Sequence, residues 1–575
     1  MFKLFKYVGK YKKNAILTSL FVAIEVVFEV AIPLVMGYIV TYGIEAKNLK
    51  MVFILGAVLV VCAAMGLIMG ILCGKNAAIA AAGFVKNLRH EMYYKVQTYS
   101  FKNIDKFSTS SIITRITTDT SNVRNAFQMI TRIAVRCPLM LIFSLIATLI
   151  VSPKLSLIYL IAVPILGICL TVIIFKAHPV FERVFKKYDK LNAVVEENVK
   201  GVRVVKSFVR EDHEIDKFEE TSKSIFKDFI KAERIVALNG PLMSFSSYLV
   251  IILLAFIGGK MIIGGNTSVT TGDLISMISY ANMILMSLMM LSFVLVSITL
   301  SRASAKRIGE ILNEESDIKI SELALTNVAN GEIEFRNVNF SYSKHAEKNC
   351  LDDINIKIKS GETIGIIGGT GSSKSTLVQL IPRLYDTSTG EVLVGGENVK
   401  DYDLVTLRDS VAMVLQKNEL FSGTIADNLR WGNPDATLEE IKHACALAQA
   451  DSFIESFPKQ YDTYIEQGGT NVSGGQKQRL CIARALLKKP KILILDDSTS
   501  AVDTKTDALI RKAFLKEIPN TTKIIIAQRI SSVQDADRII VLDDGKITGF
   551  DTHENLLKDN EIYKEVFLSQ TKGGK

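Results

Sequence analysis

The chain has 575 residues, of which 49% are hydrophobic and 22% charged, with a formal net charge of +9. This length exceeds one ordinary domain, and the apolar content excludes an intrinsically disordered chain. Seven scattered cysteines without CxxC pairs exclude a disulfide scaffold or a cysteine metal site. The lysines and arginines cluster between long apolar runs, which favours membrane topology over nucleic-acid binding as the reason for the charge.

Six apolar segments are long enough to span a bilayer, which needs about 20 residues of helix. We expect them at residues 14–40, 51–75, 133–152, 155–175, 242–264 and 273–300. The first follows a lysine-rich start and lacks a cleavage pattern, so we interpret it as a retained signal anchor. The N-terminus and the two long connections, residues 76–132 and 176–241, are rich in lysine and arginine, which predicts that they are cytoplasmic.

Both long connections have apolar residues at helical spacing, which predicts helices that continue well beyond the bilayer. The segments Phe101–Asp119 and Glu197–Phe208 lie at their expected tips and are candidates for contact with another domain. The alternative is that the connections are cytoplasmic helical hairpins with some other purpose.

Charged residues occur within or beside two predicted spans. Glu25 and Glu29 are four residues apart and share a helical face, as do Arg132 and Arg136. Charges in a membrane are costly and usually face a cavity or a partner. Two interpretations stay open, a site for a cationic substrate and structural Glu–Arg pairing between helices.

The sixth predicted span is rich in methionine, whose flexible side chain suits a promiscuous binding surface. We take Met283 and Met286 as candidate substrate contacts, with lipid-facing packing as the alternative. Residues 301–313 keep helical character but turn polar, and an unpatterned linker follows to about Gly331.

The next motif is a strand, a glycine-rich loop and a helix. Ile364–Ile367 is the expected strand and Leu377–Leu384 the expected helix. The loop between them consists of Gly368, Gly369, Thr370, Gly371, Ser372, Ser373, Lys374, Ser375 and Thr376. In such a loop, backbone N–H groups surround a polyphosphate, the lysine reaches the β and γ phosphates, and the serine after it binds Mg²⁺.

One residue departs from the phosphate-loop pattern, because Ser373 stands where GxxxxGK[ST] has glycine. Its Cβ is expected to crowd the phosphates, so this motif taken alone also permits a simple Gly/Ser turn.

Two further motifs follow. The apolar strand Ile492–Leu495 ends in Asp496 and Asp497, as a site that handles Mg²⁺ and water requires. The segment Val472–Gln476 precedes the expected helix Lys477–Leu487. Taken alone, the first is also compatible with a core strand that ends in a solvated turn, but the order and spacing of the three motifs make accident a poor explanation.

Together these motifs resemble the ATP-binding cassette (ABC) exporters, specifically half-transporters with one membrane domain ahead of one nucleotide-binding domain. The resemblance covers essentially the whole chain. It implies a membrane all-α domain of six helices fused to an α/β P-loop NTPase domain. The expected boundaries are 1–314 for the transmembrane domain, 315–330 for a linker and 331–575 for the ABC domain.

The resemblance assigns roles to individual residues. Tyr342 matches the aromatic that stacks on adenine, Gln416 the Q-loop residue that senses Mg²⁺, and Asp496 the Walker B aspartate, so that Ser375, Gln416 and Asp496 would bind the metal. The remaining matches are the signature Ser473, Gly474, Gly475 and Gln476, the D-loop Ser500–Asp503, and the coupling-loop residues Arg115 and Asp119 together with Glu197–Phe208.

Two departures from the family pattern bear on hydrolysis. Asp497 stands where the family has a catalytic glutamate, and Gln528 replaces its switch histidine. The shorter carboxylate is withdrawn from the water that a base must reach within about 3 Å, and a neutral amide lacks the charge that a histidine can carry. With Gln416, these are the candidate catalytic residues, and together they predict a site that binds ATP and hydrolyses it slowly.

The intact signature implies a partner, because in this family each ATP lies between the phosphate loop of one chain and the signature of the other. The chain therefore resembles the degenerate-site subunit of heterodimeric bacterial multidrug exporters. This implies ATP-driven efflux of small amphipathic or drug-like substrates from a bacterial cell (inner) membrane, with contacts to membrane lipid and with the N-terminus and ABC domain cytoplasmic. The alternatives are a homodimeric lipid or peptide exporter and a non-transporting, nucleotide-gated regulator.

Overall fold

The structure is a computed structural model that describes residues 2–264, 269–321, 323–343, 347–498 and 501–572. It divides into two compact units. The first comprises Met1–Gln97 and Ser108–Glu314, and the second Thr98–Phe107 and Glu315–Lys575. The short segment Thr98–Phe107 therefore packs with the nucleotide half of the chain, although it is inserted in the membrane half.

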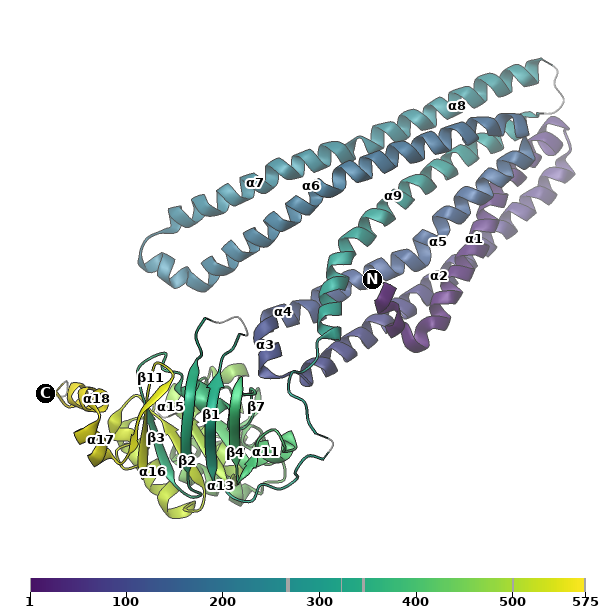
Figure 1. Cartoon of the computed structure of the whole chain (residues 1–575). Helices are drawn as coiled ribbons and strands as arrows, with labels where there is room; N and C mark the ends of the chain where they lie inside the picture. Colours follow the sequence, from purple (N-terminus) through teal and green to yellow (C-terminus); the bar gives the residue numbers. More distant parts are fainter. Residues whose placement is uncertain (1, 265–268, 322, 344–346, 499–500, 573–575) are drawn as a thin grey trace. The chain divides into compact units, whose positions relative to one another are not determined.

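The first unit is helical throughout its described elements (Figure 1). These are η1 (Phe2–Tyr11), α1 (Lys12–Tyr38), η2 (Ile39–Glu45), α2 (Leu49–Gln97), α4 (Thr109–Thr114), η3 (Arg115–Asp119), α5 (Thr120–Val151), α6 (Pro153–Ser207), α7 (Glu211–Ala237), α8 (Asn239–Ile263) and α9 (Thr271–Asn313).

Six helical segments of the described chain are long and apolar enough to cross a membrane, as predicted. They are Lys3–Glu45, Leu49–Gln97, Thr109–Val151, Pro153–Val184, Glu211–Ile263 and Thr271–Val294. The long connections are helical too. Helix α6 has 55 residues, so it is about 80 Å long at 1.5 Å per residue, well beyond a hydrocarbon core of about 30 Å.

Local sequence explains where two of these helices begin. Ser152 caps α6 by accepting from the Leu155 N–H, and a proline occupies the first helical position. Thr270 and Asp273 form a reciprocal capping box at the start of α9. Within the unit, α1 packs against α2, α5 and α9, while α6 packs against α7 and α8. Figure 1 shows α6 and α7 running side by side to a common tip.

The second unit is an α/β domain. Its elements are α3 (Phe101–Phe107), β1 (Ile333–Phe340), β2 (Leu351–Ile358), β3 (Thr363–Ile367), α10 (Lys374–Gln379), β4 (Thr389–Val394), β5 (Glu397–Asn398), α11 (Leu404–Ser410), β6 (Val411–Val414), β7 (Gly423–Thr424), α12 (Ile425–Arg430), α13 (Leu438–Leu447), α14 (Asp451–Ser456), η4 (Gln460–Asp462), β8 (Tyr464–Ile465), η5 (Gln467–Gly469), α15 (Gly474–Leu487), β9 (Ile492–Asp496), α16 (Thr504–Glu517), β10 (Thr522–Ile526), η6 (Ile530–Ser532), β11 (Arg538–Asp543), β12 (Lys546–Asp551), α17 (His553–Asp559) and α18 (Glu561–Lys572).

The central six-stranded sheet has the order β12-β11-β3-β10-β9-β6, and its strands are parallel except for the edge strand β12. A second, antiparallel sheet has the order β2-β1-β4-β5. The strands β3 and β9 are buried at every position, which their unbroken apolar runs predict for a sheet covered on both faces. The predicted fold class, an all-helical membrane domain followed by an α/β nucleotide domain, is confirmed.

Strand order places the predicted site. Strand β10 lies between β3 and β9, and Ile526 on β10 pairs with Ile366 on one side and Asp496 on the other. Strand β6 lies beyond β9. The carboxyl ends of adjacent parallel strands meet at one edge of the sheet, where α/β folds bind ligands. The segments that follow β3, β6, β9 and β10 therefore converge.

One predicted helix is shorter than expected. The sequence predicts a helix to Leu384, but α10 ends at Gln379 and the chain continues in turns. Arg383 has a φ of 50°, a left-handed conformation that no continuing α-helix accommodates.

Candidate functional site

The glycine-rich loop joins β3 to α10, and its backbone explains its glycines. A Cβ on Gly368 would lie 2.1 Å from the carbonyl oxygen of Leu542, so no larger residue fits there. Gly371 has a φ of +86°, which glycine adopts at little cost. The loop conformation is thus prescribed by close packing at its start and by a left-handed turn in its middle.

Ser373 occupies the last position before α10 with φ 70° and ψ 25°, in the left-handed region. A non-glycine residue there costs about 1–2 kcal/mol. The glycine of the motif is therefore replaced by a residue that holds the same turn under strain. Crowding of the phosphates by its Cβ stays a prediction.

Lys374 lies across the loop. Its Nζ donates to the carbonyl oxygens of Gly368 and Gly369 at 2.8 and 2.7 Å. Burial lowers the pKa of Lys374, while the nearby charges of Asp496 and Asp497 oppose this shift. A partly desolvated ammonium at this point attracts phosphate more strongly than one exposed to water.

Ser375 and Asp496 are two of the three residues that the sequence assigned to metal binding. The Ser375 hydroxyl donates to Asp496 Oδ1 at 2.9 Å. Burial raises the pKa of the Asp496 carboxyl, although the bond from Ser375 lowers it again. A hydroxyl and a carboxylate side by side are hard oxygen ligands of the kind that Mg²⁺ takes, so the residues present fit this ion.

Asp497 directly follows β9 and adopts a φ of 49°. The side-chain Nε2 of Gln528 donates to its Oδ2 at 2.9 Å, and the Gln416 side chain lies close enough to the same carboxylate to lower its pKa. Burial raises the pKa of Asp497, and both amides oppose this shift. The three residues that the sequence named as candidate catalytic groups therefore form one cluster.

The signature residues begin helix α15. The Ser473 hydroxyl accepts from the Gln476 N–H at 3.3 Å, and the Gln476 side chain accepts from the Ser473 N–H at 2.9 Å. This capping box leaves the helix N-terminus in an ordered form that suits an anion. Ser473 and Gln476 thus bond to each other rather than to the phosphate loop of their own chain.

The predicted D-loop packs against the signature, because a Cβ on Gly475 would lie 2.8 Å from the Ala501 carbonyl oxygen. Of the D-loop residues, Ser500 lies outside the described part of the chain.

Tyr342 lies beside the phosphate loop, and its hydroxyl is 3.0 Å from Thr376 Oγ1. Its ring meets that of Tyr385 edge-on at a centroid distance of 5.2 Å. The Tyr385 hydroxyl in turn donates to Asp105 Oδ2 on α3 at 2.7 Å, and Phe101 packs against the Tyr385 ring. Sequence reasoning missed Tyr385, because nothing in the sequence separates it from an ordinary core residue.

The predicted coupling-loop residues Arg115 and Asp119 lie on η3 and bind α9. Arg307 donates from Nε to Asp119 Oδ2 at 2.7 Å, and Arg115 Nη1 is 3.0 Å from Glu310 Oε2. The second predicted segment, Glu197–Phe208, ends α6 with an exposed Phe208.

Three of the four charged residues that the sequence singled out in or beside the spans, Glu25, Glu29 and Arg136, form one cluster. Arg136 on α5 donates from Nη1 to Glu25 Oε1 and from Nη2 to Glu29 Oε2, both at 2.5 Å. The structural pairing that the sequence left open therefore exists. Through these two bonds, Arg136 pairs with both carboxylates.

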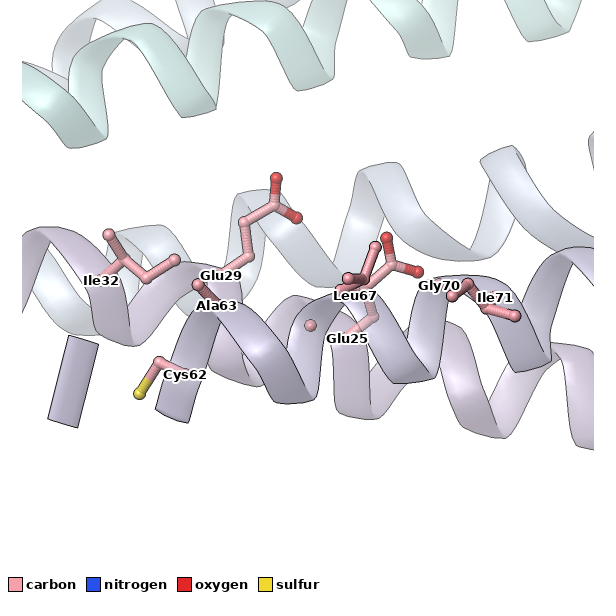
Figure 2. Close-up of a pocket in the computed structure, with 9 residues that line it drawn as sticks. Glu25, Glu29, Ile32, Cys62, Ala63, Leu67, Gly70 and Ile71 are labelled. Atoms are coloured by element: carbon pink, nitrogen blue, oxygen red, sulfur yellow. The ribbon is translucent and has the colours of Figure 1, made fainter. Parts of the chain in front are cut away.

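The two carboxylates also line a cavity of about 400 Å³ between α1 and α2. Its lining comprises Glu25, Glu29, Ile32, Cys62, Ala63, Gly66, Leu67, Gly70 and Ile71. Figure 2 shows both carboxylates pointing to the same side of the helices, with Cys62 turned the other way. The predicted contacts Met283 and Met286 do not line this cavity. Met286 is exposed, and Met283 packs beside α1.

Comparison with known proteins gives two family matches. Residues 15–289 match the ABC transporter transmembrane region, and residues 351–500 match the ABC transporter family. The uncharacterized ABC transporter ATP-binding protein YfiB of Bacillus subtilis (strain 168) is 35% identical over 99% of this chain and 98% of its own length. The uncharacterized ABC transporter ATP-binding protein Rv1273c of Mycobacterium tuberculosis is 33% identical over 98% of this chain and 97% of its own.

A third relative, the putative ABC transporter ATP-binding protein MG014 homolog of Mycoplasma pneumoniae, is 33% identical over 91% of this chain and 86% of its own. Six spans followed by an ATP-binding cassette make this chain an integral membrane protein that binds ATP and dimerises with another ABC subunit. The phosphate loop, the aspartates after β9 and the signature helix, together with these relatives, show that the chain belongs to the ABC transporters, as an exporter-type half-transporter.

Proposed function

We propose that this chain is the degenerate-site subunit of a heterodimeric ABC exporter. Its own phosphate loop binds ATP and hydrolyses it slowly, and its signature completes the hydrolytic site of a partner with glutamate and histidine at the matching positions. In the proposed topology the N-terminus and ABC domain are cytoplasmic and the spans lie in a bacterial cell membrane.

The observation that carries this proposal is the cluster around Asp497. Its carboxylate is one methylene shorter than the usual base, the amide of Gln528 donates to it, and Gln416 lies beside it. A general base must lie within hydrogen-bond reach of the water that it activates. A short carboxylate that already accepts a hydrogen bond from Gln528 is a poor base, although the phosphate loop beside it keeps the groups that hold ATP.

Ser375, Asp496 and Gln416 would hold Mg²⁺, which would neutralise charge on the phosphates. The chain's own residues supply the remaining contacts. Lys374 would attract the terminal phosphates, Tyr342 would stack on adenine, and the Gln528 amide would donate to the γ-phosphate. Tight binding with slow turnover at this site would favour whichever state of the transporter holds ATP better.

The signature supports the second half of the proposal. The capping box of Ser473 and Gln476 orders the start of α15, so that its dipole and the remaining N–H groups of its first turn are available to a γ-phosphate held by another subunit. The helices that continue from the spans would transmit the closure of the two cassettes on ATP to the membrane domain.

The cavity beside Glu25 and Glu29 supports the substrate class. Two carboxylates share one arginine there, and Glu25 Oε2 is buried without a hydrogen-bond partner among the described residues. The remainder of the lining is mostly apolar. An amphipathic monocation would be attracted to the two carboxylates and fill the apolar part, so we assign small cationic amphiphiles as substrates.

The assembly is tested by ATPase assays on the chain alone and with a partner half-transporter that has the consensus glutamate and histidine. We expect little turnover alone and rapid turnover for the pair. Ser473→Ala in this chain should abolish turnover of the pair. The matched control is Thr437→Ala, which removes an equivalent capping box at the start of α13. Brisk hydrolysis by the lone chain would refute the proposal.

The substrate class is tested with tetraphenylphosphonium as a permanent cation. Glu25→Gln and Glu29→Gln should each raise the concentration of this cation that half-maximally stimulates the pair's ATPase by at least tenfold. Glu45→Gln, at the end of η2, should leave that concentration unchanged. Equal stimulation in all variants, with unchanged thermal stability, would leave the cluster a purely structural ion pair.

A further inference from the structure

The C-terminal helix α18 contacts the backbone that carries Gln528. The side-chain Nε2 of Gln570 donates to the Gln528 carbonyl oxygen at 2.8 Å. Its Oε1 accepts from the Ile530 N–H at 2.9 Å. One amide thus uses a donor and an acceptor on two main-chain groups that are two residues apart.

Helix α18 is itself firmly anchored. Tyr563 is fully buried in the core of the unit, and its hydroxyl lies 2.7 Å from His553 Nδ1 on α17. Phe567 packs against the same core and meets the His553 ring. Tyr563, Phe567 and Gln570 are spaced by four and three residues and so share one helical face. Packing of the two aromatics therefore determines where the Gln570 amide lies.

The main-chain segment that Gln570 binds, residues 528–530, includes a residue of the ATP site. Gln528 donates from its side chain to Asp497 Oδ2 at 2.9 Å, and its main-chain carbonyl is the group that Gln570 binds. The side chains of Gln528 and Gln570 are both exposed, so the packing of neighbours does little to position either of them. The hydrogen bonds from Gln570 supply that restraint.

We propose that Gln570 is a positioning residue for the ATP site of this chain. It fixes the main chain at Gln528, and thereby keeps the side-chain amide of that residue at Asp497 and within reach of the γ-phosphate. The C-terminal helix sets how long ATP stays at this site. This role rests on the proposed function only in that ATP binds at this phosphate loop, and it is independent of the hydrolysis rate.

The test is a double-mutant cycle on the full-length chain, in which each variant is assayed for the dissociation rate of a fluorescent, non-hydrolysable ATP analogue. Gln570→Ala removes both hydrogen bonds and should speed dissociation at least about two- to tenfold, the range for one lost hydrogen bond. In the Gln528→Ala background the same change should have no further effect, because the side chain that it positions is gone. Ser569→Ala is the matched control, since its hydroxyl bonds within α18 to the Val566 carbonyl.

Gln570→Glu separates the two bonds. A carboxylate still accepts from the Ile530 N–H but cannot donate to the Gln528 carbonyl. Hydrogen exchange should therefore stay slow at Ile530 in Gln570→Glu and become faster in Gln570→Ala, while both variants release the analogue faster than wild type.

Two results would overturn the proposal. One is an unchanged dissociation rate in Gln570→Ala. The other is an equal acceleration with and without Gln528→Ala, which would make Gln570 a general structural residue. Because the analogue is not hydrolysed, neither result depends on whether the site turns ATP over slowly or briskly.

Discussion

Gln528 donates a hydrogen bond from its side-chain Nε2 to Asp497 Oδ2 across 2.9 Å. The two residues lie 31 positions apart in the chain and follow the adjacent strands β10 and β9. Both stand where the ABC family has a different residue, and the structure places their side chains against each other. This pairing is the basis of the proposal that the site holds a nucleotide and is slow to activate water.

Lengthening the carboxylate should restore hydrolysis. We expect Asp497→Glu combined with Gln528→His to raise the ATPase rate of this site at least tenfold, because general-base catalysis contributes about 10²–10⁴-fold when the base reaches its water. The rate should be measured in a pair whose partner has its own catalytic glutamate replaced by glutamine. Asp535→Glu, at an exposed carboxylate that pairs with Arg511, is the control. An unchanged rate would show that Asp497 does not limit hydrolysis.

Ser373 should be replaceable by glycine with a gain in stability. Its φ of 70° costs a non-glycine residue about 1–2 kcal/mol, and part of this is offset because glycine gains more entropy on unfolding, about 0.5–1 kcal/mol. We expect Ser373→Gly to stabilise the domain by up to about 1 kcal/mol, seen as a higher midpoint of thermal unfolding in the full chain.

The neighbouring Ser372 provides the contrast. It has no positive φ, and its hydroxyl donates to the Gly369 carbonyl at 2.8 Å. Ser372→Gly should therefore lower the unfolding midpoint. A lower midpoint for Ser373→Gly as well would contradict the strain argument.

ATP binding should take up a proton at alkaline pH. Burial lowers the pKa of Lys374 below the ordinary 10.5, so its ammonium begins to lose its proton at a lower pH than a free lysine. Phosphate favours the charged form and raises this pKa again on binding. Affinity for ATP should thus fall as pH rises through the lowered pKa of Lys374.

Calorimetry at about pH 9 in two buffers of different ionisation enthalpy measures this uptake directly. Lys374→Arg is the control, because a guanidinium stays protonated at that pH. Equal proton uptake in both proteins would assign the proton to another group.

The hydroxyl of Tyr385 should hold α3 on the nucleotide unit. Tyr385→Phe keeps the ring that packs against Tyr342 but removes the 2.7 Å hydrogen bond to Asp105. Loss of such a bond costs about 0.5–1.5 kcal/mol, so hydrogen exchange of Phe101–Phe107 should quicken about two- to tenfold in mass spectrometry of the full chain. Tyr464→Phe, at an exposed ring, should leave it unchanged. An unaltered exchange rate in Tyr385→Phe would mean that apolar packing alone holds α3.

The sequence by itself determined the features that depend on local composition. A span needs about 20 apolar residues whatever surrounds it, so six apolar runs were sufficient to predict six helices. The phosphate loop is equally local, because its glycines, lysine and serine act within one strand, turn and helix. The substitutions at Ser373, Asp497 and Gln528 could also be found in the sequence, but only by comparison with a family pattern.

Only the tertiary structure decided which distant residues meet. Gln416, Asp497 and Gln528 form one cluster because β6, β9 and β10 are adjacent parallel strands, and strand order is not a property of any single segment. The pairing of Arg136 with both Glu25 and Glu29 depends on how α5 packs against α1. Tyr385 and Gln570 carried no signal in the sequence at all. Each is an ordinary residue until the packing of the domain brings Asp105 to one and the Gln528 backbone to the other.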